Sequence, residues 1–369
     1  IELAREVARK SIVLLKNKNN ALPLKPDIGQ IYVTGHNAAD VNVLIGNYFG
    51  VSSQMVTILE GIAGHAWPTT VVQYSQGLLV GQKEVAISGM NYNASNADAT
   101  VAVIGLSPLE EGEQGDAIAS SYDGDRERIE LPAPQMEFIK DLRKRCGDRP
   151  LVVVVCGGSA MAFPEIHELA DAVLWVGYPG EQGGNALGDV LFGNAVPSGK
   201  LPVSFVKRVE DLPPFDDYAL AGRTYRYMDV EPLFPFGFGL SYTKFEFSEL
   251  ELSRSSITKG ASLKVLVSVT NTGDYRAEEV VQLYLSDVEG SVPLPKYALK
   301  SFQRVKLWPG ETKQLEFEVT PKMLEMINEA GEAQIEPGQF KVYISSSTPS
   351  QRSMDLGATP FVEAAFSVR

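Results

Sequence analysis

Four short apolar runs, each ending in or next to glycine, constrain the fold of this chain more than any other feature. They rarely alternate with polar residues, and they lie at residues 31–35, 100–106, 151–158 and 172–177. Runs of this kind are typical of parallel strands buried on both faces. Helical patterns occur at residues 2–16, 133–144, 165–170 and 184–192. This repetition predicts an open, mostly parallel α/β sandwich over residues 1–205.

From about residue 245 the pattern changes to alternation between apolar and polar residues. The clearest strand patterns lie at residues 263–270, 280–285, 314–319 and 338–344, with turn residues between them. Short strands at this spacing indicate an all-β sandwich over residues 245–369. Residues 206–244 are rich in proline, aspartate and aromatic residues, and we interpret them as the junction between the two domains.

Charge and apolar run length exclude several kinds of partner. The formal net charge of −13 argues against a nucleic acid or an anionic membrane surface as a partner. No apolar run approaches the roughly 18–20 residues of a membrane-spanning helix. Residue 1 already opens a helical pattern rather than a signal peptide, so we expect a processed or cut chain that would have lost any export signal. Localisation stays open, with secretion or a periplasmic location favoured.

The cysteines and histidines indicate neither a metal site nor a redox site. Cys156 ends a run of valines, which favours a small core residue over a reactive thiol, and no CxxC pair occurs. The three histidines are scattered along the chain, so no structural metal site is expected. No Walker or dinucleotide fingerprint is present, and we predict that the protein needs no cofactor.

Several ordered segments resemble glycoside hydrolase family 3. An aromatic and glycine-rich stretch at residues 233–243 follows a cluster at residues 222–228 and resembles that family's junction before its third domain. Further similar segments, in the family's order, lie at residues 4–17 with 22–24, 35–38 with 46–48, 125–135, 180–193 and 197–202. The resemblance covers the whole chain and implies the family's C-terminal half, an α/β sandwich followed by a fibronectin-III-like domain.

The resemblance also implies an activity. It suggests the C-terminal portion of a retaining exo-β-glycosidase that releases terminal non-reducing β-D-glucosyl residues, with a β-xyloside as the alternative substrate. The family's N-terminal barrel, which carries the nucleophilic aspartate, has no match here, so we expect it on a separate chain or a cleaved segment. This chain alone would then be inactive, and the full enzyme could form a homodimer. The other hypothesis is a non-catalytic carbohydrate-binding or assembly module.

An acidic loop is the candidate for the catalytic acid/base. Retaining glycosidases need two carboxyl groups about 5 Å apart, and the resemblance places one of them in the loop after residues 104–106. That loop leaves the carboxyl end of a predicted parallel strand, where open α/β sheets place their sites. It contains Glu111 and Glu113. Acidity alone would suggest only a solvated loop; the family's motif favours Glu113, with Glu111 close behind as a substrate-binding or acid-tuning residue.

Three smaller features complete the predictions. Asp125 and Arg126 are expected to form an ion pair that steadies the base of this loop. Glu181 is interpreted as a loop-bracing residue, and the glycines around it indicate close backbone approach at the start of a helix. The Ser286-Asp287 pair lies at the end of a predicted sandwich strand and is interpreted as a turn rather than as a nucleophile motif.

Overall fold

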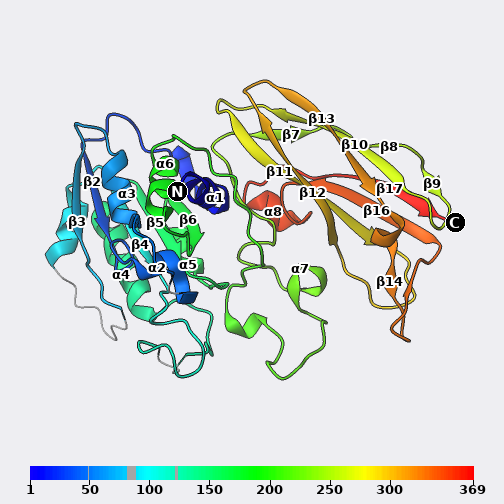
Figure 1. Cartoon of the computed structure of the whole chain (residues 1–369), viewed down its shortest axis with the longest axis horizontal. Helices are drawn as coiled ribbons and strands as arrows, with labels where there is room; N and C mark the ends of the chain where they lie inside the picture. The colour runs from blue at the N-terminus through cyan, green and yellow to red at the C-terminus, as the bar shows by residue number, and fades with distance from the viewer. Residues whose placement is uncertain (49, 81–88, 121–123) are drawn as a thin grey trace. The chain divides into compact units, whose positions relative to one another are not determined.

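The structure is a computed structural model that describes residues 1–48, 50–80, 89–120 and 124–369. The chain divides into two compact units, shown in Figure 1. The first unit comprises Ile1–Gly199 with Phe205–Val209, and the second comprises Lys200–Ser204 with Glu210–Arg369. Most of the junction predicted at residues 206–244 therefore folds with the second unit.

The first unit is built on a mostly parallel sheet that, within the described residues, has six strands in the order β1-β6-β5-β4-β2-β3. Only β1 is antiparallel to its neighbour. The strands are β1 (Val13–Asn17), β2 (Gln30–Thr34), β3 (Val71–Ser75), β4 (Ala99–Gly105), β5 (Leu151–Cys156) and β6 (Ala172–Gly177). Every residue of β4 and β5 is buried, as their unbroken apolar runs predict.

The helices of the first unit form two groups. They are α1 (Glu2–Ser11), α2 (Asn42–Ile45), α3 (Ile58–His65), α4 (Ala133–Cys146), α5 (Pro164–Leu169) and α6 (Gly183–Leu191). Helix α6 packs against α1 and α3, whereas α4 packs against α5. In the strand order of the sheet, the connections through α4 (β4 to β5) and α5 (β5 to β6) move toward β1, whereas the connection through α3 (β2 to β3) moves toward the opposite edge. Right-handed crossovers therefore place α3 on the face opposite α4 and α5.

The glycine at the end of β4 has a steric cause. Gly105 has a φ of +117°, and a Cβ there would lie 2.0 Å from the carbonyl oxygen of Cys156 on the neighbouring strand. Only a residue without a side chain allows the chain to leave the sheet so close to β5. The acidic loop begins at this turn, so the glycine that ends β4 also determines where the loop starts.

The predicted helix over residues 2–16 is wrong in its second half. The helix ends at Ser11, and Val13–Asn17 forms β1 at the edge of the sheet. Residues 12–15 are all buried, which one face of a helix cannot achieve but a strand covered on both sides can. In the helix itself, Leu3 and Val7 are exposed by 72% and 58%.

The second unit is a β-sandwich. Its strands are β7 (Phe245–Phe247), β8 (Glu251–Leu252), β9 (Ser256–Ile257), β10 (Leu263–Asn271), β11 (Ala277–Asp287), β12 (Ala298–Leu307), β13 (Thr312–Val319), β14 (Met326–Ile327), β15 (Ala333–Gln334), β16 (Gly338–Ser345) and β17 (Val362–Val368). One sheet has the path β13-β10-β7 with β8 also on β10, another has the order β12-β11-β16-β17-β9, and β14 pairs with β15. Two helices, α7 (Thr224–Tyr227) and α8 (Gln351–Asp355), also belong to this unit.

The four predicted sandwich strands correspond to β10, β11, β13 and β16, so the fold class is confirmed. The aromatic stretch at residues 233–243 contributes to the core of this unit. Phe234 and Phe238 are fully buried and stack with ring centroids 6.0 Å apart, while Phe236 stacks on Tyr225 at 4.2 Å. In the part of the chain that the structure describes, no helix has the length and apolar character needed to cross a membrane.

Candidate active site

A cavity of about 1110 Å³ lies in the first unit at the carboxyl edge of the parallel sheet. The acidic loop after β4 lines one part of it, and the ends of β5 and β6 with the residues that follow them line another. Both predicted residues, Glu111 and Glu113, border this cavity, together with Asp116. The parallel topology therefore brings the candidate loop to the position that open α/β sheets use for ligands.

Four donors surround the Glu111 carboxylate, two on each oxygen. Oε1 accepts the hydroxyl of Ser159 and lies 3.4 Å from Nη1 of Arg126. Oε2 accepts the Tyr178 hydroxyl at 2.8 Å and the Gly158 amide at 3.2 Å. A carboxylate offers about four lone-pair positions, so these donors fill its accepting capacity. They therefore hold the Glu111 side chain in one orientation.

Tyr178 is fixed in turn by the backbone around it. A Cβ at Gly46 would lie 2.8 Å from the Tyr178 ring, and a Cβ at Gly158 would lie 2.9 Å from it. Burial raises the pKa of the Tyr178 hydroxyl, and the negative charge of Glu111 raises it further. The hydroxyl therefore remains a proton donor to Glu111 at neutral pH.

Glu113 has the opposite environment. Its side chain is exposed, and its carboxylate makes no hydrogen bond or ion pair with any described residue. Its backbone is nevertheless held, because its carbonyl oxygen accepts the Asp116 amide at 2.9 Å. Gly124, with a φ of +141°, packs so closely that a Cβ there would lie 2.1 Å from the same oxygen. A fixed backbone thus presents a free carboxylate at the border of the cavity.

Glu110 was not predicted from the sequence to be a buried carboxyl group of this loop. Its side chain is only 8% exposed, and burial raises the pKa of Glu110 to about 7 despite hydrogen bonds from Ser107. The Ser107 amide and hydroxyl lie 3.3 and 3.5 Å from its Oε2. The serine followed three residues later by glutamate is a capping-box spacing and could have indicated this inward orientation.

His36 lies beneath the same loop. Its Nε2 is 3.9 Å from Oε2 of Glu110, and burial lowers the pKa of His36 to about 4 although the Gly105 carbonyl opposes this. At neutral pH the imidazole is therefore uncharged, and its contact with Glu110 is not an ion pair.

The expected pairing of Asp125 with Arg126 is corrected by the structure. Within residues 1–48, 50–80, 89–120 and 124–369, Arg126 forms its ion pair with Glu111 rather than Asp125, and its Nη1 also donates to the Ser159 hydroxyl at 2.6 Å. Arg126 still steadies the acidic loop, but through Glu111 and the turn after β5.

The glycine-rich block around Glu181 allows close helix packing. A Cβ at Gly184 would lie 1.9 Å from the carbonyl oxygen of Thr57, at the start of α3. Glu181 accepts the hydroxyl of Ser52 and its carbonyl accepts the Val56 amide at 2.8 Å, in agreement with a bracing role. Among the described residues, no group of three or more histidine, cysteine, aspartate or glutamate side chains is placed to hold a metal ion.

Comparisons with known proteins agree with this architecture. The glycosyl hydrolase family 3 C-terminal domain matches residues 12–242, and a fibronectin type III-like domain matches residues 279–348. The chain is 35% identical over 390 residues to a periplasmic β-glucosidase of Salmonella typhimurium, in a match that covers 96% of this chain and 49% of that relative. It is also 35% identical over 364 residues to a β-xylosidase of Formosa agariphila, in a match that covers 94% and 48%.

A solved structure gives the same result. A β-glucosidase from Erythrobacter marinus matches with a TM-score of 0.84 at 31% identity, covering 100% of this chain and 50% of that one. The chain thus spans about half the length of the relatives it matches. The resemblance noted in the sequence is confirmed, and the chain belongs to glycoside hydrolase family 3, through the C-terminal domain of that family.

Proposed function

We propose that this chain is the C-terminal portion of a retaining exo-β-glycosidase that hydrolyses terminal non-reducing β-D-glucosyl residues. The observation that carries the proposal is the cavity at the carboxyl edge of the sheet, bordered by two glutamates of one loop. Similarity to β-glucosidases over nearly the whole chain supports the substrate class. The retaining mechanism needs a second carboxyl group, which in this proposal comes from a part of the enzyme outside residues 1–369.

In this proposal Glu113 is the general acid/base. Its carboxyl group is exposed and uncommitted, so it can donate a proton to the leaving oxygen and later take one from water without breaking existing contacts. Glu111 is a positioning residue, because its filled set of donors ties the loop to Ser159 and Tyr178. Replacing Glu111 should therefore act through the geometry of the loop.

The nucleophile would come from the barrel half of the enzyme, on a separate chain or a cleaved segment. The chain alone should then fold but fail to hydrolyse an aryl β-glucoside. A homodimer of the complete enzyme is compatible with this scheme. The β-xylosidase alternative has its own support, since a β-xylosidase matches this chain with the same identity as a β-glucosidase does.

The test compares three variants of the assembled enzyme, Glu113→Gln, Glu111→Gln and Asp116→Asn. Asp116 borders the same cavity and serves as the matched carboxylate control. Glu113→Gln should lower turnover by about 10²–10⁴-fold for substrates with poor leaving groups, the usual contribution of a general acid. Activated aryl glycosides should be affected much less in the step that breaks the glycosidic bond. Azide should restore turnover in the following step, where it replaces water in releasing the sugar from the glycosyl-enzyme intermediate.

The leaving-group dependence distinguishes the two glutamates. If Glu111→Gln shows that dependence and azide rescue while Glu113→Gln does not, the proposed roles are reversed. If neither variant shows them, the acid/base lies outside this loop. Sugar binding without turnover in the complete enzyme would favour the non-catalytic module, and parallel assays with β-glucosides and β-xylosides decide the sugar.

A further inference from the structure

Glu110 is a buried carboxyl group of the acidic loop that the proposed proton transfer does not use. Its side chain is 8% exposed, and its contacts to described residues are made by Oε2. This oxygen lies 3.3 and 3.5 Å from the amide and hydroxyl of Ser107 and 3.9 Å from Nε2 of His36. A carboxyl group removed from water with so few donors favours its protonated form.

The charged groups that face Glu110 do not compensate for its burial. Among the described residues these groups are His36, Glu111 and Arg126. His36 is uncharged at neutral pH, because burial lowers its pKa to about 4. Burial is the main cause that raises the pKa of Glu110 to about 7; the hydrogen bonds from Ser107 oppose it, and Glu111 and Arg126 act in opposite directions. Arg126 is itself paired with Glu111.

The backbone connects Glu110 to the rest of the acidic loop. The Ser107 carbonyl accepts the amides of both Glu110 and Glu111, each at 2.9 Å. The Leu109 carbonyl accepts the Ala119 amide at 2.7 Å, so this turn is also joined to the far side of the loop. Movement of the Glu110 side chain into solvent would break its contacts with Ser107 at the turn that precedes the proposed acid/base.

We propose that Glu110 is a positioning residue, which holds the acidic loop in place while its carboxyl group is neutral and loosens the loop when it ionises. The inference rests on the proposed function, because this loop carries the proposed acid/base. An ionised Glu110 would be a buried charge without a cation of its own and with the Glu111 carboxylate nearby, and opening of the loop would return it to water. The stabilisation of the closed loop is therefore complete below the ordinary pKa of 4.5 and is lost as pH rises through the folded pKa of about 7.

Hydrogen–deuterium exchange on the 369-residue chain measures how readily the loop opens. Protection factors of peptides from residues 107–119 are compared at about pH 6 and about pH 8, each relative to the unfolded chain at the same pH. A pKa of 4.5 in the open loop and about 7 in the closed loop predicts about tenfold weaker protection at the higher pH.

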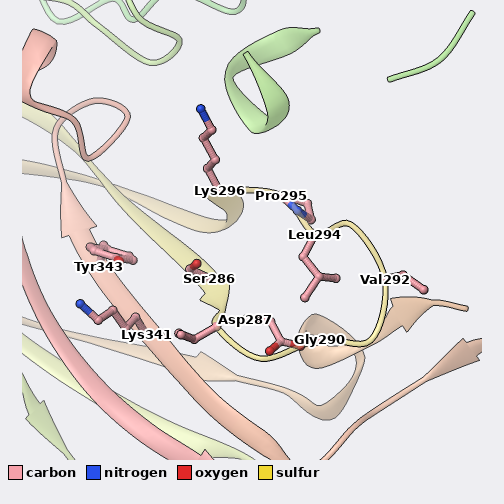
Figure 2. Close-up of a pocket in the computed structure, with 10 residues that line it drawn as sticks. Ser286, Asp287, Gly290, Val292, Leu294, Pro295, Lys296, Lys341 and Tyr343 are labelled. Atoms are coloured by element: carbon pink, nitrogen blue, oxygen red, sulfur yellow. The ribbon is translucent and has the colours of Figure 1, made fainter. Parts of the chain in front are cut away.

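Two variants and one control test whether Glu110 causes this change. Glu110→Gln and Glu110→Met keep the side chain neutral, and methionine adds no polar group that needs a partner. In both variants the loop should be equally protected at the two pH values. The control is Asp287→Asn in the second unit. Burial also raises the pKa of Asp287, which borders a cavity of about 470 Å³ shown in Figure 2, and this variant should keep the tenfold change in the acidic loop.

The assembled enzyme tests the consequence for catalysis. The fall in kcat/KM between about pH 6 and about pH 8 should be smaller for Glu110→Gln than for the native enzyme. The exchange measurement needs no substrate, so a failure of the proposed function is detected separately, by the leaving-group dependence of Glu113→Gln. Equal protection at both pH values in the native chain, a pH response that persists in both Glu110 variants or disappears in Asp287→Asn, or parallel pH profiles of the native and Glu110→Gln enzymes would each overturn the proposal.

Discussion

Replacing Gly61 with alanine should destabilise the first unit, whereas the same change at Gly64 in the same helix should not. A Cβ at Gly61 would lie 1.9 Å from the carbonyl oxygen of Gly184 and 2.1 Å from the carbonyl carbon. Both are backbone atoms, which cannot rotate away. A Cβ at Gly64 would meet nothing within 4 Å. Helices α3 and α6 would have to separate by about 1.5 Å to accommodate the added methyl group of Gly61→Ala at ordinary contact distance.

Both substitutions gain from the higher helix propensity of alanine, but only Gly61→Ala also introduces a steric clash. Alanine is favoured over glycine within a helix by about 1 kcal/mol, and by less in a last turn such as that of Gly64. Overpacking typically costs about 1–3 kcal/mol, and contact with rigid backbone places Gly61→Ala at the upper end. We therefore expect the free energy of unfolding to fall by about 2 kcal/mol for Gly61→Ala and to rise by about 0.5 kcal/mol for Gly64→Ala.

Thermal unfolding followed by circular dichroism measures the difference. In a domain of this size, 1 kcal/mol corresponds to about 2–4 °C in Tm. The transition of the first unit should therefore move down by about 4–8 °C for Gly61→Ala and up by about 1–2 °C for Gly64→Ala. Equal shifts in the two variants would refute the close-packing explanation, because they would show that helix propensity alone decides the outcome.

Two further predictions concern buried groups of the first unit. Asp189 is 3% exposed and receives hydrogen bonds from Arg5 and Arg9, so Asp189→Asn should lower the free energy of unfolding by about 3–5 kcal/mol in urea denaturation. Burial raises the pKa of Asp189, but the hydrogen bonds from the two arginines lower it overall, below its ordinary value. The stabilisation by the ionised carboxylate is therefore complete above the unfolded pKa of about 3.9 and is lost as pH falls through the lower folded pKa. The Asp189→Asn variant should lack this loss of stability in acid. Burial also raises the pKa of the Cys146 and Cys156 thiols, so iodoacetamide should label neither in the folded chain and both in urea; labelling of the native chain would contradict this.

The central strands could be predicted from sequence because their environment is uniform. A strand covered on both faces, such as β4 or β5, selects apolar residues at every position. Edge strands leave a weaker pattern. The sequence VVQYS of β3 has exposed or half-exposed positions throughout, and β12 carries lysines, a serine and an arginine, so neither was predicted. The helix over residues 2–16 was extended too far because the short apolar run at residues 12–15 does not by itself distinguish a strand from the continuation of a helix.

The contacts of the candidate site depend on sequence-distant neighbours. The position of Glu111 after a parallel strand could be predicted, but its partners Ser159 and Tyr178 are 48 and 67 residues away. They approach it because β5 lies between β4 and β6 in the sheet, so the carboxyl ends of all three strands meet at one edge. Strand order, rather than any local motif, therefore decides which side chains surround the acidic loop.

The same loop gives three neighbouring glutamates different chemical environments. The Ser107 carbonyl accepts the amides of both Glu110 and Glu111, and this turn directs Glu110 into the interior and Glu111 toward the end of β5. Glu110 is buried, which raises its pKa to about 7, and the Glu111 carboxylate is held by four donors. A general acid/base must gain and lose its proton within each catalytic cycle, in contact with both substrate and water. Of the three, Glu113 is exposed, borders the cavity and makes no hydrogen bond or ion pair with any described residue, and for this reason we propose it for the proton transfer and propose Glu111 as support of the loop.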